Sequence, residues 1–260
     1  DVLEAVLQTS DGGYLLGGKS ESIDEDVGGN YGDDDYWVVK IDALGNIEWE
    51  QSYGGEFGDG LSVLKETNDG GFILGGYTAS NNGDVEGSNN GNEDYYDYWV
   101  VKIDNVGNII WENTYGTPQY EQAHSISTTS DGHFLLCGHS SGLDPLHNLY
   151  LTKITTDGLV LYEKHYGGEK HDGGTSAIEL SNGHLLLAGE TDSYGNGSKR
   201  AFFLETDATG EIIEELSFGG DLSDKFSAIV EMDNAYYLIG ESASLAVGGA
   251  VDMYVVKRGK

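Results

Sequence analysis

Short stretches of alternating apolar and polar residues, each bounded by Gly, Asn or Asp, follow one another along the whole chain. In NIIWENTY, Ile109, Trp111, Asn113 and Tyr115 share one face, which is the period of two of a half-buried β-strand. One segment of roughly fifty residues holds four such runs: LSVLKET, GFILGGYTA, DYWVVKI and NIIWENTY. We name these expected strands A to D and expect tight turns, with Gly at positive φ, between A and B and between C and D.

Three landmarks recur and define the repeat. DGGYLLGG begins at Asp11 and returns as DGGFILGG, DGHFLLCG, NGHLLLAG and DNAYYLIG. DYWVVKID begins at Asp35, is identical at Asp97, and weakens to NLYLTKIT, RAFFLETD and DMYVVKRG. GNIEWEQSYGG begins at Gly45 and returns as GNIIWENTYG, GLVLYEKHYGG and GEIIEELSFGG. Four short strands per repeat are typical of a β-propeller blade.

The repeats predict an all-β fold, a five-bladed β-propeller of four-stranded antiparallel blades in a single domain over residues 1–260. We expect the blades at about 1–55, 56–117, 118–168, 169–220 and 221–260. The fifth repeat has strands A to C but no fourth run before Lys260. We therefore expect that the chain continues beyond one end or that a partner supplies the strand. Otherwise the run DMYVVKRGK is an open edge, protected only by its Lys and Arg.

The formal charge is −32, from 45 acidic residues against 13 Lys and Arg. This charge argues against nucleic-acid binding and against adsorption to anionic membranes, because both need a basic surface. It suits a saline medium or divalent cations. No apolar run approaches membrane-spanning length and no signal peptide opens the chain, so the start at Asp1 indicates a mature or trimmed protein. Cys137 lies in the apolar run FLLCG, which favours a buried inert thiol over a nucleophile.

The strand order places the D–A and B–C connections on one face and the tight A–B and C–D turns on the other. We expect the tight-turn face to contribute little to function, and the long B–C loops of the first two blades to carry it. Carboxylate and Asn oxygens on a Gly-rich backbone suit Ca²⁺, although neither loop has the EF-hand pattern, and a solvated turn without an ion is the alternative. The calcium candidates are Asp24, Asp26, Asp33, Asp34, Asn82, Asp84, Glu93 and Asp94.

An acidic residue precedes strand A in every repeat, and we expect these residues to ring the mouth of a central channel. They are Asp1, Asp59, Glu121, Asp172 and Asp224. One interpretation is a carboxylate that caps a turn by accepting hydrogen bonds from local backbone N–H groups. The other is an axial cation or water cluster held by some of the five.

Familiar catalytic motifs are missing from the sequence: G-x-S-x-G, H-E-x-x-H, a phosphate loop and CxxC do not occur. His139 and His147 flank Asp144, but surface histidines are a better interpretation than a transition-metal site. The four Trp residues fall at equivalent C and D positions, which favours core packing over a sugar-stacking platform. Acids at the channel mouth could serve a glycosidase, but repeated symmetric acids are more typical of a scaffold. We expect no enzymatic activity.

The motifs DGGFILGGYTASNNGDVEG, DYWVVKID and GNIIWENTYG resemble the tandem repeats of large secreted proteins from the Bacteroidota. Such proteins often end in a sorting domain of the type IX secretion system, which is not recognisable in residues 1–260. The resemblance implies an extracellular or cell-surface β-propeller and supplies no established catalytic residues. We expect a non-catalytic binding or adhesion module that takes a glycan or protein ligand on the B–C face, with calcium as the candidate cofactor. The alternatives are a glycoside hydrolase and an assembly unit that pairs through its open edge strand.

Overall fold

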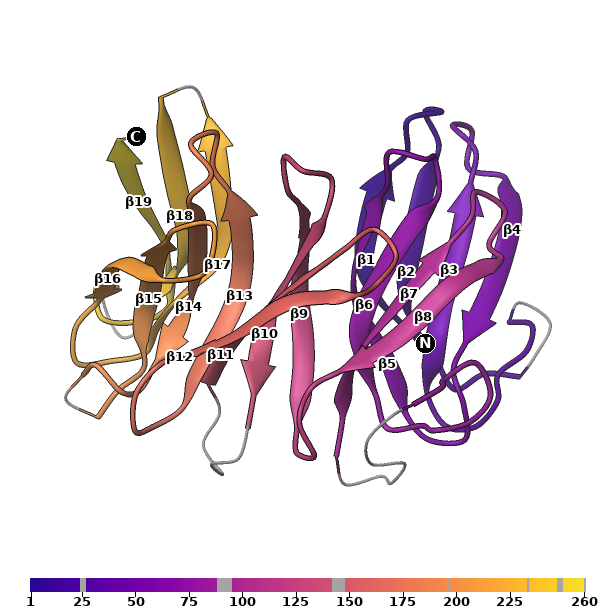
Figure 1. The fold of residues 1–260 in the computed structure, drawn as a ribbon, viewed down its shortest axis with the longest axis horizontal. Coiled ribbons are helices and arrows are strands. Elements are labelled where there is room, and N and C mark those ends of the chain that lie inside the picture. The colour runs from indigo at the N-terminus through magenta and orange to yellow at the C-terminus, as the bar shows by residue number, and fades with distance from the viewer. Residues whose placement is uncertain are drawn as a thin grey trace. The chain divides into compact units, whose positions relative to one another are not determined.

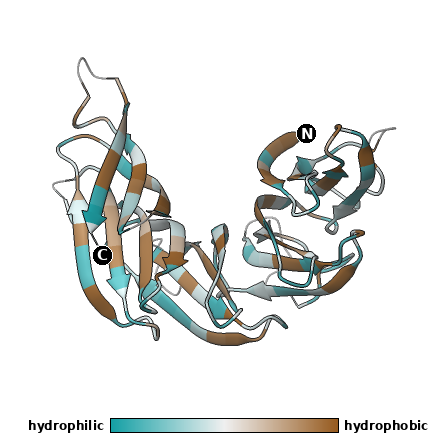
Figure 2. Cartoon of the chain, turned by 90° about the horizontal axis from the view of Figure 1, so that it is seen from above, coloured by the Kyte–Doolittle hydropathy of each residue, from teal (hydrophilic) through white to brown (hydrophobic). Residues whose placement is uncertain are grey.

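The computed structural model describes residues 1–23, 27–87, 95–141, 148–195, 197–232, 234–246 and 250–259 (Figure 1). These residues form nineteen β-strands, and no helix is found among them. The all-β expectation is confirmed. Figure 2 shows apolar and polar bands alternating along the strands, as the sequence pattern predicts.

The first two sheets contain the strands of the first two repeats in chain order. Sheet one has the order β1-β2-β3-β4, with β1 (Val2–Gln8), β2 (Tyr14–Ser20), β3 (Asp35–Ile41) and β4 (Ile47–Tyr53). Sheet two has the order β5-β6-β7-β8, with β5 (Asp59–Glu66), β6 (Phe72–Thr78), β7 (Asp97–Ile103) and β8 (Ile109–Tyr115). All neighbouring strands in both sheets are antiparallel, so the predicted four-stranded blades are confirmed here.

The remaining sheets follow the same plan. Sheet three contains β9 (Glu121–Thr128), β10 (Phe134–Ser140), β11 (Asn148–Ile154) and β12 (Val160–Tyr166). Sheet four contains β13 (Asp172–Glu179), β14 (Leu185–Thr191), β15 (Arg200–Thr206) and β16 (Ile212–Phe218). The last sheet has three strands, β17 (Asp224–Met232), β18 (Ala235–Ser242) and β19 (Asp252–Gly259). A fourth strand from a longer chain or a partner stays a prediction.

Two compact units divide the chain, residues 1–124 and residues 125–260, with the boundary inside β9. Sheets one and two belong to the first unit, and sheets four and five to the second. A single domain over the whole chain stays a prediction.

The tight turns have the geometry that their glycines predict. In the first A–B turn, Thr9 N–H donates to the Gly13 carbonyl at 3.0 Å, and Gly12 has φ of 89°. In the first C–D turn, the backbone N–H groups of Leu44 and Asn46 both donate to Asp42 Oδ1. The repeated Asp-x-x-Gly-Asn therefore makes a turn in which one carboxylate satisfies two backbone donors.

The lysine of DYWVVKI pairs with the aspartate of DGG in the same blade. Lys102 Nζ lies 2.9 Å from Asp69 Oδ1, and only 4% of the Lys102 side chain is exposed. The same contact, also 2.9 Å, joins Lys40 to Asp11 and Lys153 to Asp131. Two landmarks more than twenty residues apart are thus halves of one ion pair, repeated in three blades.

The Lys102–Asp69 pair predicts a pH dependence of stability. Burial acts to raise the pKa of Asp69, but hydrogen bonds from Thr67 and Lys102 outweigh it and lower the pKa to about 2. A carboxyl whose folded pKa is depressed stabilises the fold above its unfolded pKa, and this contribution is lost as the pH falls from about 4 through about 2. Urea titrations across this range should show a smaller loss of unfolding free energy for Asp69→Asn than for the native chain. Equal losses for both would contradict the pairing.

The core of the first unit is built where its two sheets meet. The rings of Tyr36 and Trp99 lie 4.5 Å apart, and Tyr36 Oη donates to the Trp99 carbonyl at 3.0 Å. Tyr53 Oη donates to the carbonyl of Gly107 at 2.7 Å. The core-packing interpretation is confirmed for Trp99, which is fully buried. Cys137 in the second unit is also buried, and burial raises the pKa of its thiol to about 12.

Candidate functional site

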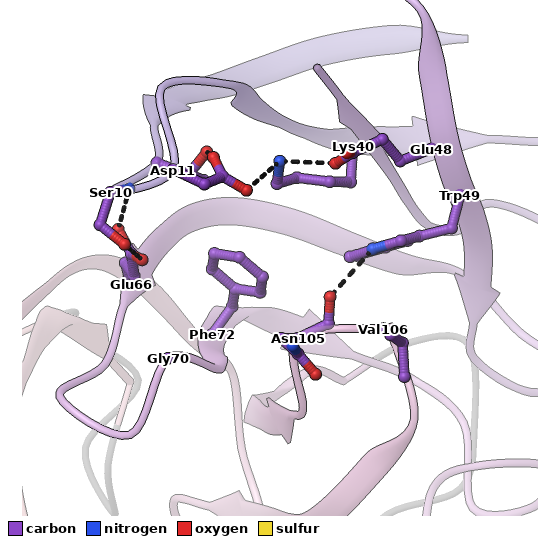
Figure 3. A pocket seen from close by; sticks show the side chains of 11 residues that line it. Ser10, Asp11, Lys40, Glu48, Trp49, Glu66, Gly70, Phe72, Asn105 and Val106 are labelled. Atoms are coloured by element: carbon purple, nitrogen blue, oxygen red, sulfur yellow. Dashed lines mark hydrogen bonds and ion pairs between the residues drawn. The ribbon is translucent and has the colours of Figure 1, made fainter. Parts of the chain in front are cut away.

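A pocket of about 480 Å³ lies on the tight-turn side of sheets one and two, within the first unit (Figure 3). Its walls come from both A–B turns, from the C–D turn of the second blade, and from the start of β4. The lining residues that carry its chemistry are Ser10, Asp11, Lys40, Trp49, Glu66 and Phe72. The pocket lies on the face that the sequence predicts to contribute little to function, and that prediction stays untested.

Charged groups form one wall of the pocket. Lys40 Nζ lies 2.9 Å from Asp11 Oδ2 and 2.8 Å from Glu48 Oε2, so both of these carboxylates hold one ammonium group (Figure 3). The Lys40 side chain is 4% exposed, whereas those of Asp11 and Glu48 are 58% and 45% exposed. Hydrogen bonds from the Thr9 hydroxyl and from Lys40 lower the pKa of Asp11. Asp11 is thus ionised at neutral pH and presents accepting oxygens to the pocket.

The indole of Trp49 forms the second wall, and the Phe72 ring beside it is only 2% exposed. Trp49 and Phe72 lie 6.5 Å apart with their planes tilted by 53°. Trp49 Nε1 donates to the Asn105 carbonyl at 3.1 Å, which fixes the orientation of the indole. Figure 3 shows the Phe72 ring between Trp49 and Glu66. The two blades are joined at this edge because Ser10 donates its N–H and its hydroxyl to Glu66, at 2.8 and 2.5 Å.

The acids that precede strand A accept hydrogen bonds from the connection before strand A and from hydroxyl groups at and just after the end of strand B. Asp59 Oδ2 accepts the Gly55 N–H at 2.8 Å and the Ser80 hydroxyl at 3.0 Å, while Oδ1 accepts the Thr78 hydroxyl. The same set recurs twice: Asp172 with Gly168, Thr191 and Ser193, and Asp224 with Gly220, Ser242 and Ser244. All three aspartates are buried.

Two further acids of this set differ in detail. Glu121 is buried and accepts the Thr117 N–H at 3.1 Å and the Thr117 hydroxyl at 2.8 Å. Asp1 is exposed and accepts hydroxyls from Ser20 and Ser22. A sequence signal for this arrangement exists, because a hydroxyl residue ends strand B and a Ser follows two residues later in four repeats: Ser20 and Ser22, Thr78 and Ser80, Thr191 and Ser193, Ser242 and Ser244. Their role as an axial cation ring stays a prediction.

Four of the calcium candidates lie in the part of the chain that the structure describes. Asp33 is exposed, Asp34 pairs with Lys19, Asn82 Oδ1 accepts the Glu56 N–H at 2.8 Å, and Asp84 Oδ2 faces the Gly54 N–H at 3.4 Å. The other candidates, Asp24, Asp26, Glu93 and Asp94, lie outside the described residues, as do Asp144 and His147. Within the described ranges, no group of three or more His, Cys, Asp or Glu side chains is arranged to hold a metal.

Asp35 is a further buried acid that the sequence reasoning missed. It is 1% exposed, and its Oδ2 accepts the Tyr31 N–H at 2.5 Å, whereas its Oδ1 has no hydrogen-bond partner among the residues that the structure describes. Burial raises the pKa of Asp35 to about 7 against the lowering effect of the Tyr31 bond, and the charges of Asp59 and Asp84 add to the rise. Burial also raises the pKa of Asp59 to about 6. In the sequence, the one feature that marks Asp35 is its place as the first residue of strand C.

Antiparallel four-stranded blades joined by tight A–B and C–D turns define a protein of the β-propeller class. The model of the family Arylsulfotransferase (ASST) matches residues 55–249, so the chain belongs to this family. No curated protein matches the sequence. Among the described residues, no helix is long and apolar enough to cross a membrane.

Solved structures show the same fold at low sequence identity. A protein of unknown function from Dyadobacter fermentans has a TM-score of 0.57 and 14% identity, over 97% of this chain and 74% of that one. The β-propeller domain of the Trilobed protease from Pyrococcus furiosus, described as having an open velcro topology, has a TM-score of 0.53 and 11% identity, over 98% of this chain and 67% of that one. These similarities establish the fold and leave the finer resemblance to secreted Bacteroidota repeat proteins as a prediction.

Proposed function

We propose that this member of the arylsulfotransferase family is a non-catalytic extracellular binding module, and that the pocket in Figure 3 takes a neutral glycan. The observation that carries the proposal is the combination, in one pocket of about 480 Å³, of the Trp49 indole with the carboxylates of Asp11 and Glu48. That volume lies in the range of small-molecule sites.

The chemistry of the lining matches a hydroxyl-rich ligand. Trp49 offers an apolar ring to the C–H face of a sugar, and its orientation is fixed by the bond to Asn105. Asp11 and Glu48 accept hydrogen bonds and remain partly exposed after pairing with Lys40. Three carboxylates, counting Glu66, against one ammonium group give the lining a net negative charge, which favours a neutral ligand over an anionic one.

The acidic residues support binding more than catalysis. A glycosidase needs one carboxyl that keeps its proton near neutral pH. Asp11 in the pocket is not such a group, because hydrogen bonds from Thr9 and Lys40 lower its pKa, and Asp35, whose pKa burial raises to about 7, does not line the pocket. The acids that precede strand A are engaged with loop N–H groups and hydroxyls, as described for Asp59 and Asp172. An extracellular location belongs to the same proposal, with calcium as the candidate cofactor, and is supported by the acidic composition and the resemblance to exported repeat proteins.

Sulfuryl transfer is the second candidate, and the family match favours it. An aryl sulfate is an anion, and the charge that develops during its transfer is stabilised by cationic groups or by fixed N–H donors. In the lining of the pocket the ammonium of Lys40 is already held by Asp11 and Glu48. This pairing supports binding over transfer at the pocket.

We predict that Trp49→Ala weakens glycan binding at least tenfold, which corresponds to about 1.4 kcal/mol. A glycan array on the native chain would identify the ligand, and calorimetric titration of both proteins would give the ratio of dissociation constants. Trp111→Ala is the matched control, because Trp111 holds the same repeat position in β8 and does not line the pocket. Turnover of a chromogenic glycoside, or transfer from 4-nitrophenyl sulfate to a phenol, would overturn the non-catalytic proposal.

A further inference from the structure

Carboxylates from three chain segments converge on the backbone of Gly54, in the D–A connection of the first unit. The oxygens Asp35 Oδ1 and Asp59 Oδ2 both lie against the side of Gly54 where a Cβ would stand, Asp59 Oδ2 at 2.7 Å from that point. Asp84 Oδ2 lies 3.4 Å from Gly54 N. Three carboxyl groups thus gather around a residue that has no side chain.

The oxygens of Asp35 and Asp59 are not equivalent. Both side chains are buried, but each oxygen of Asp59 accepts at least one hydrogen bond, whereas Asp35 Oδ1 has no partner within the described part of the chain. A buried carboxylate oxygen that faces a second carboxylate is costly to desolvate and is repelled by its neighbour. The arrangement lacks a positive charge at this oxygen.

The fourth blade has a basic residue at the position that corresponds to Asp35. In the first unit the Asp59 N–H donates to the Asp34 carbonyl at 2.5 Å, and in the second unit the Asp224 N–H donates to the Lys199 carbonyl at 3.0 Å. The next residue, the first of strand C, is Asp35 in one case and Arg200 in the other. An arginine therefore stands in the fourth blade at the position that a second acid occupies in the first.

We propose that a calcium ion binds between Asp35 and Asp59, with Asp35 Oδ1 as a ligand. Asp35 Oδ1 and Asp59 Oδ2 supply two carboxylate oxygens there, and the carboxylate of Asp84 lies nearby, at 3.4 Å from Gly54 N. Hard oxygen donors select Ca²⁺ or Mg²⁺ over softer metals, and Ca²⁺ tolerates the irregular geometry of carboxylates on separate loops, completed by water. This site is separate from the glycan pocket and does not depend on it.

Calcium titrations of three proteins stripped with EDTA test the proposal. Calorimetry and thermal unfolding at pH 7.5 should show binding and a raised midpoint for the native chain. Asp35→Asn should bind calcium at least tenfold more weakly, yet should unfold at a higher temperature than the native chain in EDTA, because it removes one of two facing charges. The matched control is Asp33→Asn, an exposed acid two residues away, which should keep the native response.

Each contrary result has a distinct meaning. A native chain that gives no calcium heat and no thermal shift overturns the proposal, and so does a response lost equally in Asp33→Asn, which would put the ion in the loop. Stabilisation at lower pH without a calcium response would indicate a shared proton instead and would also overturn it. If Asp35→Asn does not fold, the calcium titrations of the native chain and of Asp33→Asn still test the proposal. Trp49→Ala should keep the full calcium response, which separates this test from that of glycan binding.

Discussion

Trp99→Ala is expected to lower the free energy of unfolding by about 3–5 kcal/mol, the range for a large aromatic residue removed from a packed core. Trp99 is fully buried, and its ring packs against Tyr36 at 4.5 Å. Its Nε1 donates to Glu112 Oε2 at 2.8 Å. The substitution therefore opens a cavity and also removes a hydrogen bond from a half-buried carboxylate.

Urea unfolding followed by far-ultraviolet circular dichroism measures this loss without relying on tryptophan emission. Trp37→Ala is the internal control, because Trp37 holds the same position in the first blade and is only partly buried. We expect its loss to be less than half of that of Trp99→Ala. Equal losses at the two positions would contradict the view that the contact between sheets one and two gives Trp99 its importance.

Asp172→Ala is expected to cost about 3 kcal/mol in the second unit. The carboxylate accepts the Gly168 N–H and the Ser193 hydroxyl, each at 2.7 Å, and the hydroxyl of Thr191. Alanine leaves these donors without their acceptor inside a buried connection, and each buried donor left unpaired costs about 1–3 kcal/mol. The D–A connection should also become more exposed to solvent.

Chemical denaturation gives the cost, and amide hydrogen exchange at Gly168 reports on the connection. Asp157→Ala serves as the control, because Asp157 is an exposed acid in a C–D turn, and its removal should change stability by less than about 0.5 kcal/mol. Asp172→Asn should lie between the two. A loss below about 1 kcal/mol for Asp172→Ala would show that the carboxylate is dispensable to the connection.

The blades could be predicted from the sequence because their determinants are local. Period-two alternation and Asp-Gly turns fix strands such as Ile109–Tyr115 within a few residues, and repetition multiplies the signal. The acid that pairs with Lys102 is also part of the repeat, as the Asp69 of DGG, but this motif by itself indicates only a turn. Its Asp69 lies on a neighbouring strand connection, and only the register of β6 with β7 brings the two together.

The pocket and the acid at Asp35 could not be predicted in the same way. The pocket combines Ser10, Trp49 and Asn105, which come from three turns or strands of two blades. Its chemistry depends on how neighbouring sheets face each other, and the alternation pattern does not encode this. Asp35 becomes a candidate ligand because its Oδ1 lies beside Gly54 together with Asp59 Oδ2, and this contact joins residues of three separate segments. The arylsulfotransferase family was also outside the expectation, since the repeat motifs suggested a different group of proteins.

The ion pairs inside the blades have a consequence for the evolution of the chain by duplication of its repeats. Lys40, Lys102 and Lys153 each find their acid in their own repeat, so a copied repeat arrives with its buried cation already neutralised. Contacts that cross from one blade to the next, such as Asp59 at Gly54, depend on both copies and must change together. Sequence divergence should therefore concentrate at the positions where one repeat contacts the next. The first residue of strand C is an example, since it is Asp35 in the first repeat and Arg200 in the fourth.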